Sequence, residues 1–215
     1  MSDGCFSCSG RCCYDIIVPV SFMDIGRLVR AQGLAPDEIV EPWKERTPTA
    51  SGIAIDDTDD RYLPILQRNP REPAACAFLV HVADEIKRCG MYADRPEVCR
   101  VYPFTMASGA LDRRDDARCA PGDWNLATLD YRRRREEHEA FNAERSAHEI
   151  VARSFANVPR VARETSRFAR FLAYGEAVYD RIANEWPRCS VAPFDERLRA
   201  VSAAAINISS QSYQF

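Results

Sequence analysis

The sequence lacks any hydrophobic run long enough to cross a bilayer. Its longest apolar region, 16–23, contains Pro19 and Ser21 and falls well short of the roughly 20 residues that a spanning helix needs. Residues 1–13 carry neither a basic segment nor an apolar stretch, so they do not resemble a secretory signal. These absences predict a cytoplasmic protein that has no contact with a membrane.

An excess of positive charge is also missing. The 29 Lys and Arg residues are outnumbered by 32 Asp and Glu residues, which gives a formal net charge of −3. Binding to nucleic acid relies on clustered cations that neutralise phosphates. The composition therefore argues against nucleic acid as a partner.

Disulfide bonds are a further feature that we do not expect, although the chain has nine cysteines. In a reducing cytoplasm, cysteines serve more often as metal ligands or reactive thiols, and an odd count agrees with this. Cys189 stands alone in a helical region, where we expect a buried apolar residue. The other eight precede residue 120: Cys5, Cys8, Cys12, Cys13, Cys76, Cys89, Cys99 and Cys119.

The first four of these cysteines fall within nine residues. Cys5 and Cys8 are three positions apart, so a tight turn can direct both sulfurs at one ion. Cys12 and Cys13 are adjacent, and their side chains leave the backbone in different directions. We expect one of them to complete a site with Cys5 and Cys8. The other points to a second site, bridges two metals or is buried.

The second group of cysteines is spread over a longer segment, and its local sequence also suits metal ligands. Gly90 follows Cys89 and permits close approach of the backbone to an ion. Pro96 at the first helical position places Cys99 in an opening turn, where unpaired amides favour a thiolate. Arg95 beside this turn would offset the negative charge of a thiolate centre. The alternative is that these cysteines are buried, inert thiols.

The order of these motifs resembles the YkgJ-like cysteine-cluster family of zinc- or iron-chelating proteins. That family has CxxC, then CC, then a Cys-x-Phe-Leu strand, then Cys-x-x-Tyr-x-x-Arg-Pro-x-x-Cys-Arg-x-Tyr/Phe-Pro. The matching residues here are Cys5 to Cys13, Cys76-Ala-Phe78-Leu79 and the run from Cys89 to Phe104. The resemblance spans about residues 5–125 and implies that all eight N-terminal cysteines belong to one metal module. It leaves zinc, iron and a [4Fe-4S] cluster open.

The resemblance also implies an alternative function, because the family includes flagellin lysine N-methylases described as carrying an iron–sulfur cluster. The alternative is methylation of protein lysines with S-adenosylmethionine. The sequence shows no glycine-rich loop after a strand of the kind that cradles this cofactor in doubly wound folds. We assign no catalytic residue, and nominate only the polar and aromatic residues Tyr92, Arg95, Arg100 and Tyr102 for such a pocket. A thiol-based redox sensor is a third interpretation.

The expected fold class is α+β. Residues 1–125 would form a small irregular cysteine-cluster module with short strands, stapled by zinc or iron and packed against a helical region over 126–215. Within the module, we expect a helix capped by Ser21 and ended by Gly33, and a second helix from Pro36 to about Trp43. Strands are predicted over 75–82 and 101–107, with one helical turn from Pro96 between them.

The C-terminal region is predicted to contain a helical hairpin over 124–157 and 160–186, and a shorter helix over 195–206. An apolar stripe should face the rest of the protein, and the helices offer a surface for a protein partner. His138 and His148 are expected to be solvated. The arginines of 132–135 should pair with the glutamates that follow them on an exposed face. The stripe consists of Phe168, Phe171, Leu172, Val178, Tyr179 and Ile182.

Overall fold

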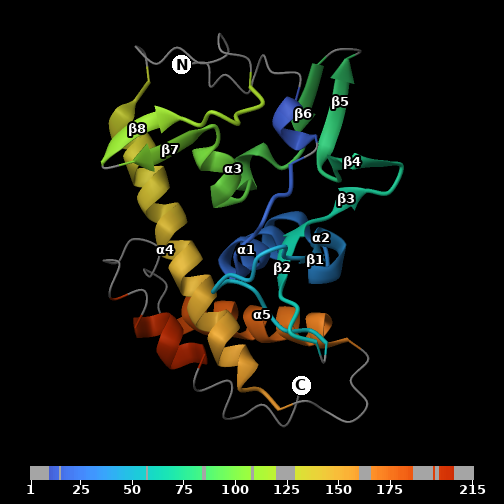
Figure 1. The fold of residues 1–215 in the computed structure, drawn as a ribbon, viewed down its shortest axis with the longest axis vertical. Helices are drawn as coiled ribbons and strands as arrows, with labels where there is room; N and C mark the ends of the chain where they lie inside the picture. The colour runs from blue at the N-terminus through green and yellow to red at the C-terminus, as the bar shows by residue number, and fades with distance from the viewer. Residues whose placement is uncertain are drawn as a thin grey trace. The chain divides into compact units, whose positions relative to one another are not determined.

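Short antiparallel strand pairs and helices make up the protein, which confirms the α+β class (Figure 1). The chain forms two compact units: unit 1 comprises Met1–Val18 and Leu66–Phe141, and unit 2 comprises Pro19–Ile65 and Asn142–Phe215. The division of the chain near residue 125 stays a prediction. The computed structural model describes residues 10–14, 16–56, 58–83, 86–107, 109–119, 129–159, 166–185, 196 and 199–205.

Unit 1 is built from short elements. Its strands pair as two-stranded antiparallel sheets, β3 with β4, β5 with β6 and β7 with β8. The elements are η2 (Arg11–Cys13), β3 (Arg68–Asn69), β4 (Glu72–Cys76), β5 (Leu79–Ala83), β6 (Ile86–Cys89), η3 (Tyr92–Asp94), α3 (Glu97–Val101), β7 (Phe104–Ala107) and β8 (Ala110–Arg113).

Two of the predicted strands differ from the observed ones. The segment 75–82 is not one strand, because a turn at 77–78 separates β4 from β5. The chain changes partner at this turn, where the amide of Ala77 donates to Gln67 O at 2.9 Å and that of Gly90 donates to Phe78 O at 2.8 Å. The segment 101–107 begins as the last residue of α3 and becomes strand only at Phe104. The helical turn expected after Pro96 is confirmed as α3.

Unit 2 is mainly helical. Its N-terminal segment holds two helices and the paired strands β1 and β2, and its C-terminal segment holds helices. The helix α4 contributes residues to both units, and Leu66 at the end of β2 belongs to unit 1. The elements are α1 (Phe22–Gln32), α2 (Pro36–Ile39), β1 (Val40–Lys44), β2 (Tyr62–Leu66), α4 (Tyr131–Ala156), α5 (Arg167–Glu185) and a helical segment over 199–205.

The helix α1 begins and ends as its sequence predicts. Ser21 Oγ accepts the amide N–H of Asp24 at 2.9 Å, and the Asp24 carboxylate accepts the amide of Ser21 at 2.9 Å. Gly33 ends the helix with φ of 66°, a left-handed conformation that glycine adopts without a Cβ clash. The second predicted helix begins at Pro36, but its extension to Trp43 is wrong because 40–44 forms β1. The β-branched and aromatic residues at 40 and 43 favour a strand.

Aromatic rings fill the centre of unit 2. The ring of Phe155 lies 5.3 Å from that of Phe171 and 5.5 Å from that of Tyr174, measured between centroids. The hydroxyl of Tyr174 donates to Ala205 O at 2.9 Å, so the apolar body is buried while its polar atom is satisfied. In the predicted stripe of α5, Tyr179 is half-buried and the other five residues are buried, as expected. The predicted starts of the two hairpin helices lie outside the described residues.

The solvated positions predicted for His138 and His148 are wrong. Their exposed fractions are only 6% and 3%. His148 Nδ1 accepts the amide N–H of Phe22 at 3.2 Å, and Nε2 lies 3.2 Å from Ser51 O. Burial lowers the pKa of His148 to about 4, because a charged imidazole would lose its hydration. The ring is therefore a neutral part of the interior whose two nitrogens both have partners.

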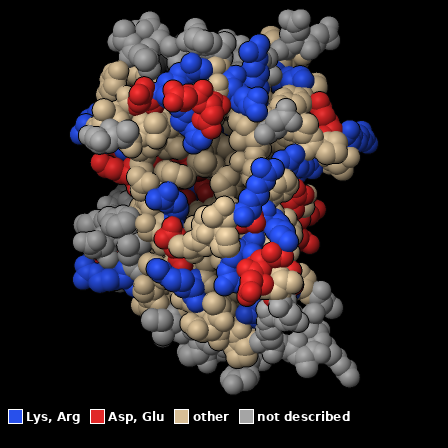
Figure 2. Space-filling view, in the orientation of Figure 1, with Lys and Arg blue, Asp and Glu red and all other residues tan. Residues whose placement is uncertain are grey.

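Charged side chains of both signs lie beside one another on the face shown in Figure 2. Along α4, Arg133 pairs with Glu137 at 3.1 Å, which confirms the predicted pairing of these arginines and glutamates. Arg134 departs from the predicted exposed face, because it is 3% exposed and donates to Arg100 O at 3.1 Å. Among the described residues, no helix combines the length and apolar character that crossing a bilayer would require.

Candidate metal centre

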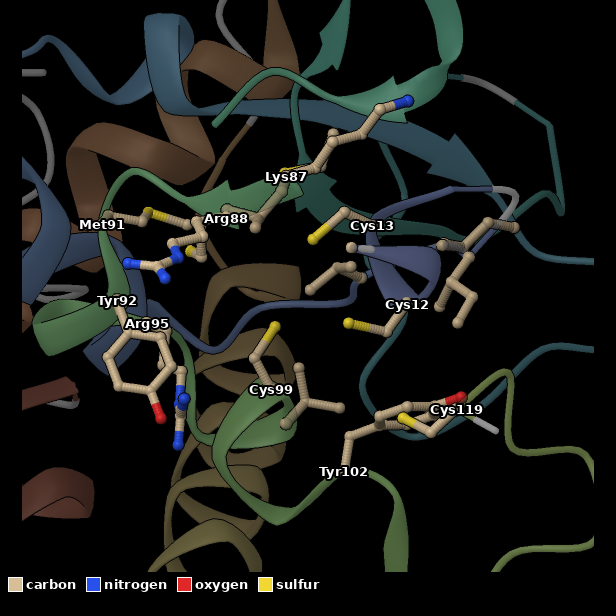
Figure 3. A pocket seen from close by; sticks show the side chains of 18 residues that line it. Cys12, Cys13, Lys87, Arg88, Met91, Tyr92, Arg95, Cys99, Tyr102 and Cys119 are labelled. Atoms are coloured by element: carbon tan, nitrogen blue, oxygen red, sulfur yellow. The ribbon is translucent and has the colours of Figure 1, made fainter. Parts of the chain in front are cut away.

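One cavity of unit 1 brings together every cysteine of the predicted metal set that the structure describes. It has a volume of about 310 Å³. Figure 3 shows the sulfurs of Cys12, Cys13 and Cys99 directed toward the open middle of the view. Cys5, Cys8 and Cys189 lie outside the described residues. The six cysteines that line the cavity are Cys12, Cys13, Cys76, Cys89, Cys99 and Cys119.

These thiols come from five separate segments of the chain. The adjacent pair lies in η2, and Cys76 and Cys89 are the last residues of β4 and β6. Cys99 lies in α3, and Cys119 follows β8. Because none of these elements is longer than five residues in unit 1, the cavity depends on how they are held together.

The turn that carries the adjacent pair needs glycine at its start. Gly10 has φ of 72°, and the amide of Cys13 donates to Gly10 O at 2.8 Å. A Cβ at this position would lie 2.9 Å from Leu79 Cδ1 and 3.0 Å from Lys87 Cβ. The turn thus packs directly against β5 and β6, which fixes its two cysteines at the cavity.

Cys76 and Cys89 have the same local arrangement. The amide N–H of Phe78 donates to the sulfur of Cys76, and that of Met91 donates to the sulfur of Cys89, each from two residues further on. Burial raises the pKa of Cys76 to about 11 and also raises the pKa of Cys89, because the cavity disfavours a bare thiolate. The amide donors act in the opposite direction. A turn of this kind is suited to hold a thiolate once a cation compensates its charge.

The thiols of Cys12 and Cys13 are hydrogen-bonded to each other. The S–H of Cys13 donates to the sulfur of Cys12, which lowers the pKa of Cys12 and raises the pKa of Cys13. Although adjacent side chains leave the backbone in different directions, both of these reach the same cavity. The 3-10 turn η2 provides this geometry.

A buried arginine supplies positive charge to the cavity. Arg95 is 6% exposed, and its Cζ lies 4.1 Å from the centroid of the Tyr92 ring. After the hydrogen bond from Cys13, the charge of Arg95 also helps to lower the pKa of Cys12. It opposes the effect of burial on the pKa of Cys89.

Of the polar and aromatic residues nominated from the sequence, Tyr92, Arg95 and Tyr102 line the cavity. Arg100 lies elsewhere, because its guanidinium donates to the backbone oxygens of Ala93 at 2.6 Å and Arg95 at 3.1 Å. The Tyr102 hydroxyl accepts the amide of Arg118. Arg100 therefore supports the backbone before α3 instead of contacting the cavity.

Apolar side chains form most of the remaining wall, and sequence reasoning had missed them. The run 16–18 follows the cysteine turn directly and belongs to the longest apolar region of the sequence. An apolar wall excludes water and strengthens every charge interaction inside. The only sequence signal for this wall was the position of an apolar run beside a cysteine motif. The apolar lining consists of Ile16, Ile17, Val18, Leu66, Met91 and Val98.

The donor set fits a thiophilic ion. Thiolates are ligands of zinc and of iron in iron–sulfur centres, and the cavity offers six thiols with a buried cation beside them. Within the described residues, no three His, Cys, Asp or Glu side chains stand at the spacing of a finished metal site. Rotation about the Cα–Cβ bonds and loss of the thiol protons are the changes that such a site would require.

Comparison with known proteins identifies a family. No curated protein and no solved structure matches the chain. A family model named CxxCxxCC, with the description "Putative zinc- or iron-chelating domain", matches residues 4–143. The matched range contains all six cavity cysteines and also Cys5 and Cys8. Since the match covers more than half of the 215 residues, the chain belongs to the CxxCxxCC family of zinc- or iron-chelating domains.

Proposed function

We propose that this protein binds zinc or iron through cysteine thiolates, and that the metal centre is the structural staple of the cysteine-cluster module. The observation that carries the proposal is the convergence of six thiols from five chain segments on one cavity. Membership of a zinc- or iron-chelating family supports metal binding. The proposed ligands are Cys5, Cys8, Cys12, Cys13, Cys76, Cys89, Cys99 and Cys119.

A structural role is supported by the sheets of unit 1. Each of its sheets has two strands, and an isolated hairpin is marginally stable in water. Cysteines at the ends of β4 and β6, in α3 and after β8 would tie these hairpins to one centre. Metal binding of this kind supplies folding free energy directly.

A redox-active iron–sulfur centre, including a [4Fe-4S] cluster, is the second candidate. The amide N–H donors to the sulfurs of Cys76 and Cys89 favour it, because such donors tune the reduction potential of a cluster. The apolar wall of the cavity would also tune the reduction potential, because it limits the access of solvent to the cluster. We place the protein in the cytoplasm, since nine cysteines without a disulfide role suit a reducing compartment.

The methylase alternative has weaker support. It rests on the family resemblance and on Tyr92, Arg95 and Tyr102, the nominated residues that line the cavity. Calorimetry of S-adenosylmethionine with anaerobically purified, metal-loaded protein tests it, and an absence of binding heat removes it. The use of the C-terminal helices as a surface for a protein partner stays a prediction.

The test of metal binding is elemental analysis together with a visible absorption spectrum of protein purified without oxygen. We expect zinc or iron in at least stoichiometric amount, with sulfide-to-iron absorbance only if iron is present. Cys76→Ser and Cys89→Ser should lower the metal content. Cys189→Ser is the matched control, because this cysteine lies outside the proposed set, and it should keep its metal. A wild-type protein without zinc or iron would contradict the proposal.

A further inference from the structure

We propose that the cavity cysteines form one polynuclear thiolate centre, which holds at least two zinc or iron ions and shares the Cys12–Cys13 pair between them. This inference rests on the proposed metal-binding function and goes beyond it. A metal module with many cysteines could instead contain two independent four-thiolate sites. The distinction matters because a shared centre is gained and lost as a unit.

The number of donors exceeds the need of one ion. A structural zinc or a single iron takes four thiolates in a tetrahedron. Six cysteines line the same cavity. A second ion is required if all of these thiols are to be ligands.

The adjacent pair favours sharing over separation. In two independent sites, Cys12 and Cys13 would point into separate cavities with protein between them. Here both line one cavity, and both sulfurs are directed toward its open middle in Figure 3. Two thiolates that share one apolar cavity repel each other strongly. Ions placed between them would convert that repulsion into attraction.

The charge balance of the cavity also favours two ions over one. Six thiolates around one divalent ion would leave four uncompensated negative charges, whereas two divalent ions would leave two. The wall holds three further cations, of which Arg95 is buried, and is otherwise largely apolar; the other two are Lys87 and Arg88. The smaller excess of charge is much easier to accommodate in such a wall.

The size of the cavity also suits more than one ion. Its volume is about 310 Å³. A single ion with Zn–S bonds of about 2.3 Å draws four sulfurs closely around itself. Such an ion would leave much of this cavity unfilled and some of its thiols without a metal partner.

The first experiment uses the wild-type full-length chain. Metal-free protein is prepared under reducing, anaerobic conditions and titrated with Co²⁺, while thiolate-to-cobalt absorbance and the electron paramagnetic resonance signal are recorded. Bridging thiolates couple two cobalt spins, so the signal per cobalt should fall as loading passes one ion per chain. Saturation at one cobalt per chain, or a signal that grows in proportion to cobalt up to two, would overturn the inference.

The second experiment compares single cysteine variants. Loss of a shared ligand should remove more than one ion per chain. If the sites were independent, Cys13→Ser would lose one ion, so we expect it to lose at least twice that amount. Cys189→Ser is again the control and should keep the wild-type stoichiometry. Retention of one fully occupied ion in both Cys13→Ser and Cys76→Ser, with two in the wild type, would show independent sites.

The outcomes separate this inference from the proposed function. Wild-type protein without any zinc, iron or cobalt binding would overturn both. A single ion, or two ions with no magnetic coupling, would overturn the shared centre and leave metal binding in place. Because the cobalt titration needs no variant, the inference remains testable even if the serine variants fail to fold.

Discussion

The side chains at the centre of unit 1 differ in kind from those at the centre of unit 2. Unit 2 packs the rings of Phe155, Phe171 and Tyr174 together at centroid distances of 5.3 and 5.5 Å. Unit 1 instead surrounds a cavity with six thiols and a buried Arg95. Apolar burial stabilises the first arrangement without any ligand. Thiols around a cavity contribute little until an ion binds them.

The secondary structure also differs between the two units, and again unit 2 has the more extensive apolar packing. Unit 2 contains α1 and α5, helices of 11 and 19 residues, and a Cβ on Gly26 of α1 would lie 2.4 Å from Tyr179 of α5. Unit 1 relies on two-stranded sheets and turns. Long helices in direct contact bury a continuous apolar face, which short hairpins cannot do. We therefore expect the two units to respond differently to the same perturbation.

Removal of metal should have the largest effect and should separate the units most clearly. Structural zinc sites contribute on the order of 10 kcal/mol of apparent binding free energy to folding. Chelation under reducing conditions should abolish amide protection in β3 to β6 and α3, whereas α1 and α5 keep theirs. Hydrogen exchange read by mass spectrometry measures this. Equal exchange with and without metal would mean that unit 1 folds without its ligand.

Phe171→Ala should produce the converse pattern. The side chain is fully buried against Phe155 and His148, so its truncation should lower the free energy of unfolding by about 3–5 kcal/mol. Urea unfolding followed by helical circular dichroism measures the loss, and the metal content should not change. Tyr131→Ala removes an aromatic ring that is 53% exposed and serves as the control, with an expected change below about 0.5 kcal/mol. A metal content that fell with Phe171→Ala would erase the contrast between the units.

Acid should weaken unit 2 through His148. The folded pKa is about 4 and the ordinary value is 6.5, so between these pH values the unfolded chain binds a proton that the folded chain does not. The free energy of unfolding is therefore highest above pH 6.5 and falls toward pH 4, by on the order of 3 kcal/mol from this group. Urea unfolding across this pH range measures the slope.

Variants can test whether His148 causes this dependence of the free energy of unfolding on pH. His148→Gln should be less stable at neutral pH but should lack this part of the acid dependence. His81→Gln makes the same substitution at an exposed position and serves as the matched control. An unchanged slope in His148→Gln would show that other groups cause the acid sensitivity.

The smallest effect is expected at Gly33. Its φ of 66° is unfavourable for a residue with a Cβ, and nothing lies within 4 Å of where that Cβ would be. Gly33→Ala should therefore cost about 1 kcal/mol from the backbone alone, with no loss of metal. Gly33→Asn should recover part of this, since asparagine tolerates the left-handed region. Equal stability of the wild type and Gly33→Ala would indicate that the helix end adjusts.

Local signals made α1 and the grouping of the cysteines predictable. Ser21 and Asp24 form the capping box that their spacing indicates, and Gly33 ends the helix. The six described cysteines of the predicted set line one cavity, whereas their role as metal ligands stays a prediction. In both cases the deciding interactions lie within a few residues or within one ordered motif. Such patterns remain visible in a single sequence.

The features that the sequence did not predict depend on tertiary contacts. His148 lies in a charged helical segment, yet its ring is enclosed through Phe22 and Ser51, which are more than 90 positions away. The turn that divides 75–82 into two strands is set by the partners of Ala77 and Gly90. Neither contact has a local signature, because residue pattern alone does not specify which distant group completes a hydrogen bond.

The chain passes between the two units three times, after Val18, after Ile65 and after Phe141. On the ribosome, synthesis is vectorial, so every cysteine of the proposed cluster is made before residue 142. The segment 19–65 emerges early as well, but the aromatic partners that complete its unit come last. A nascent chain can therefore bind its ion while the helices of 19–65 still lack the C-terminal residues that complete their unit. The supply of metal during translation is then an early determinant of the yield of folded protein.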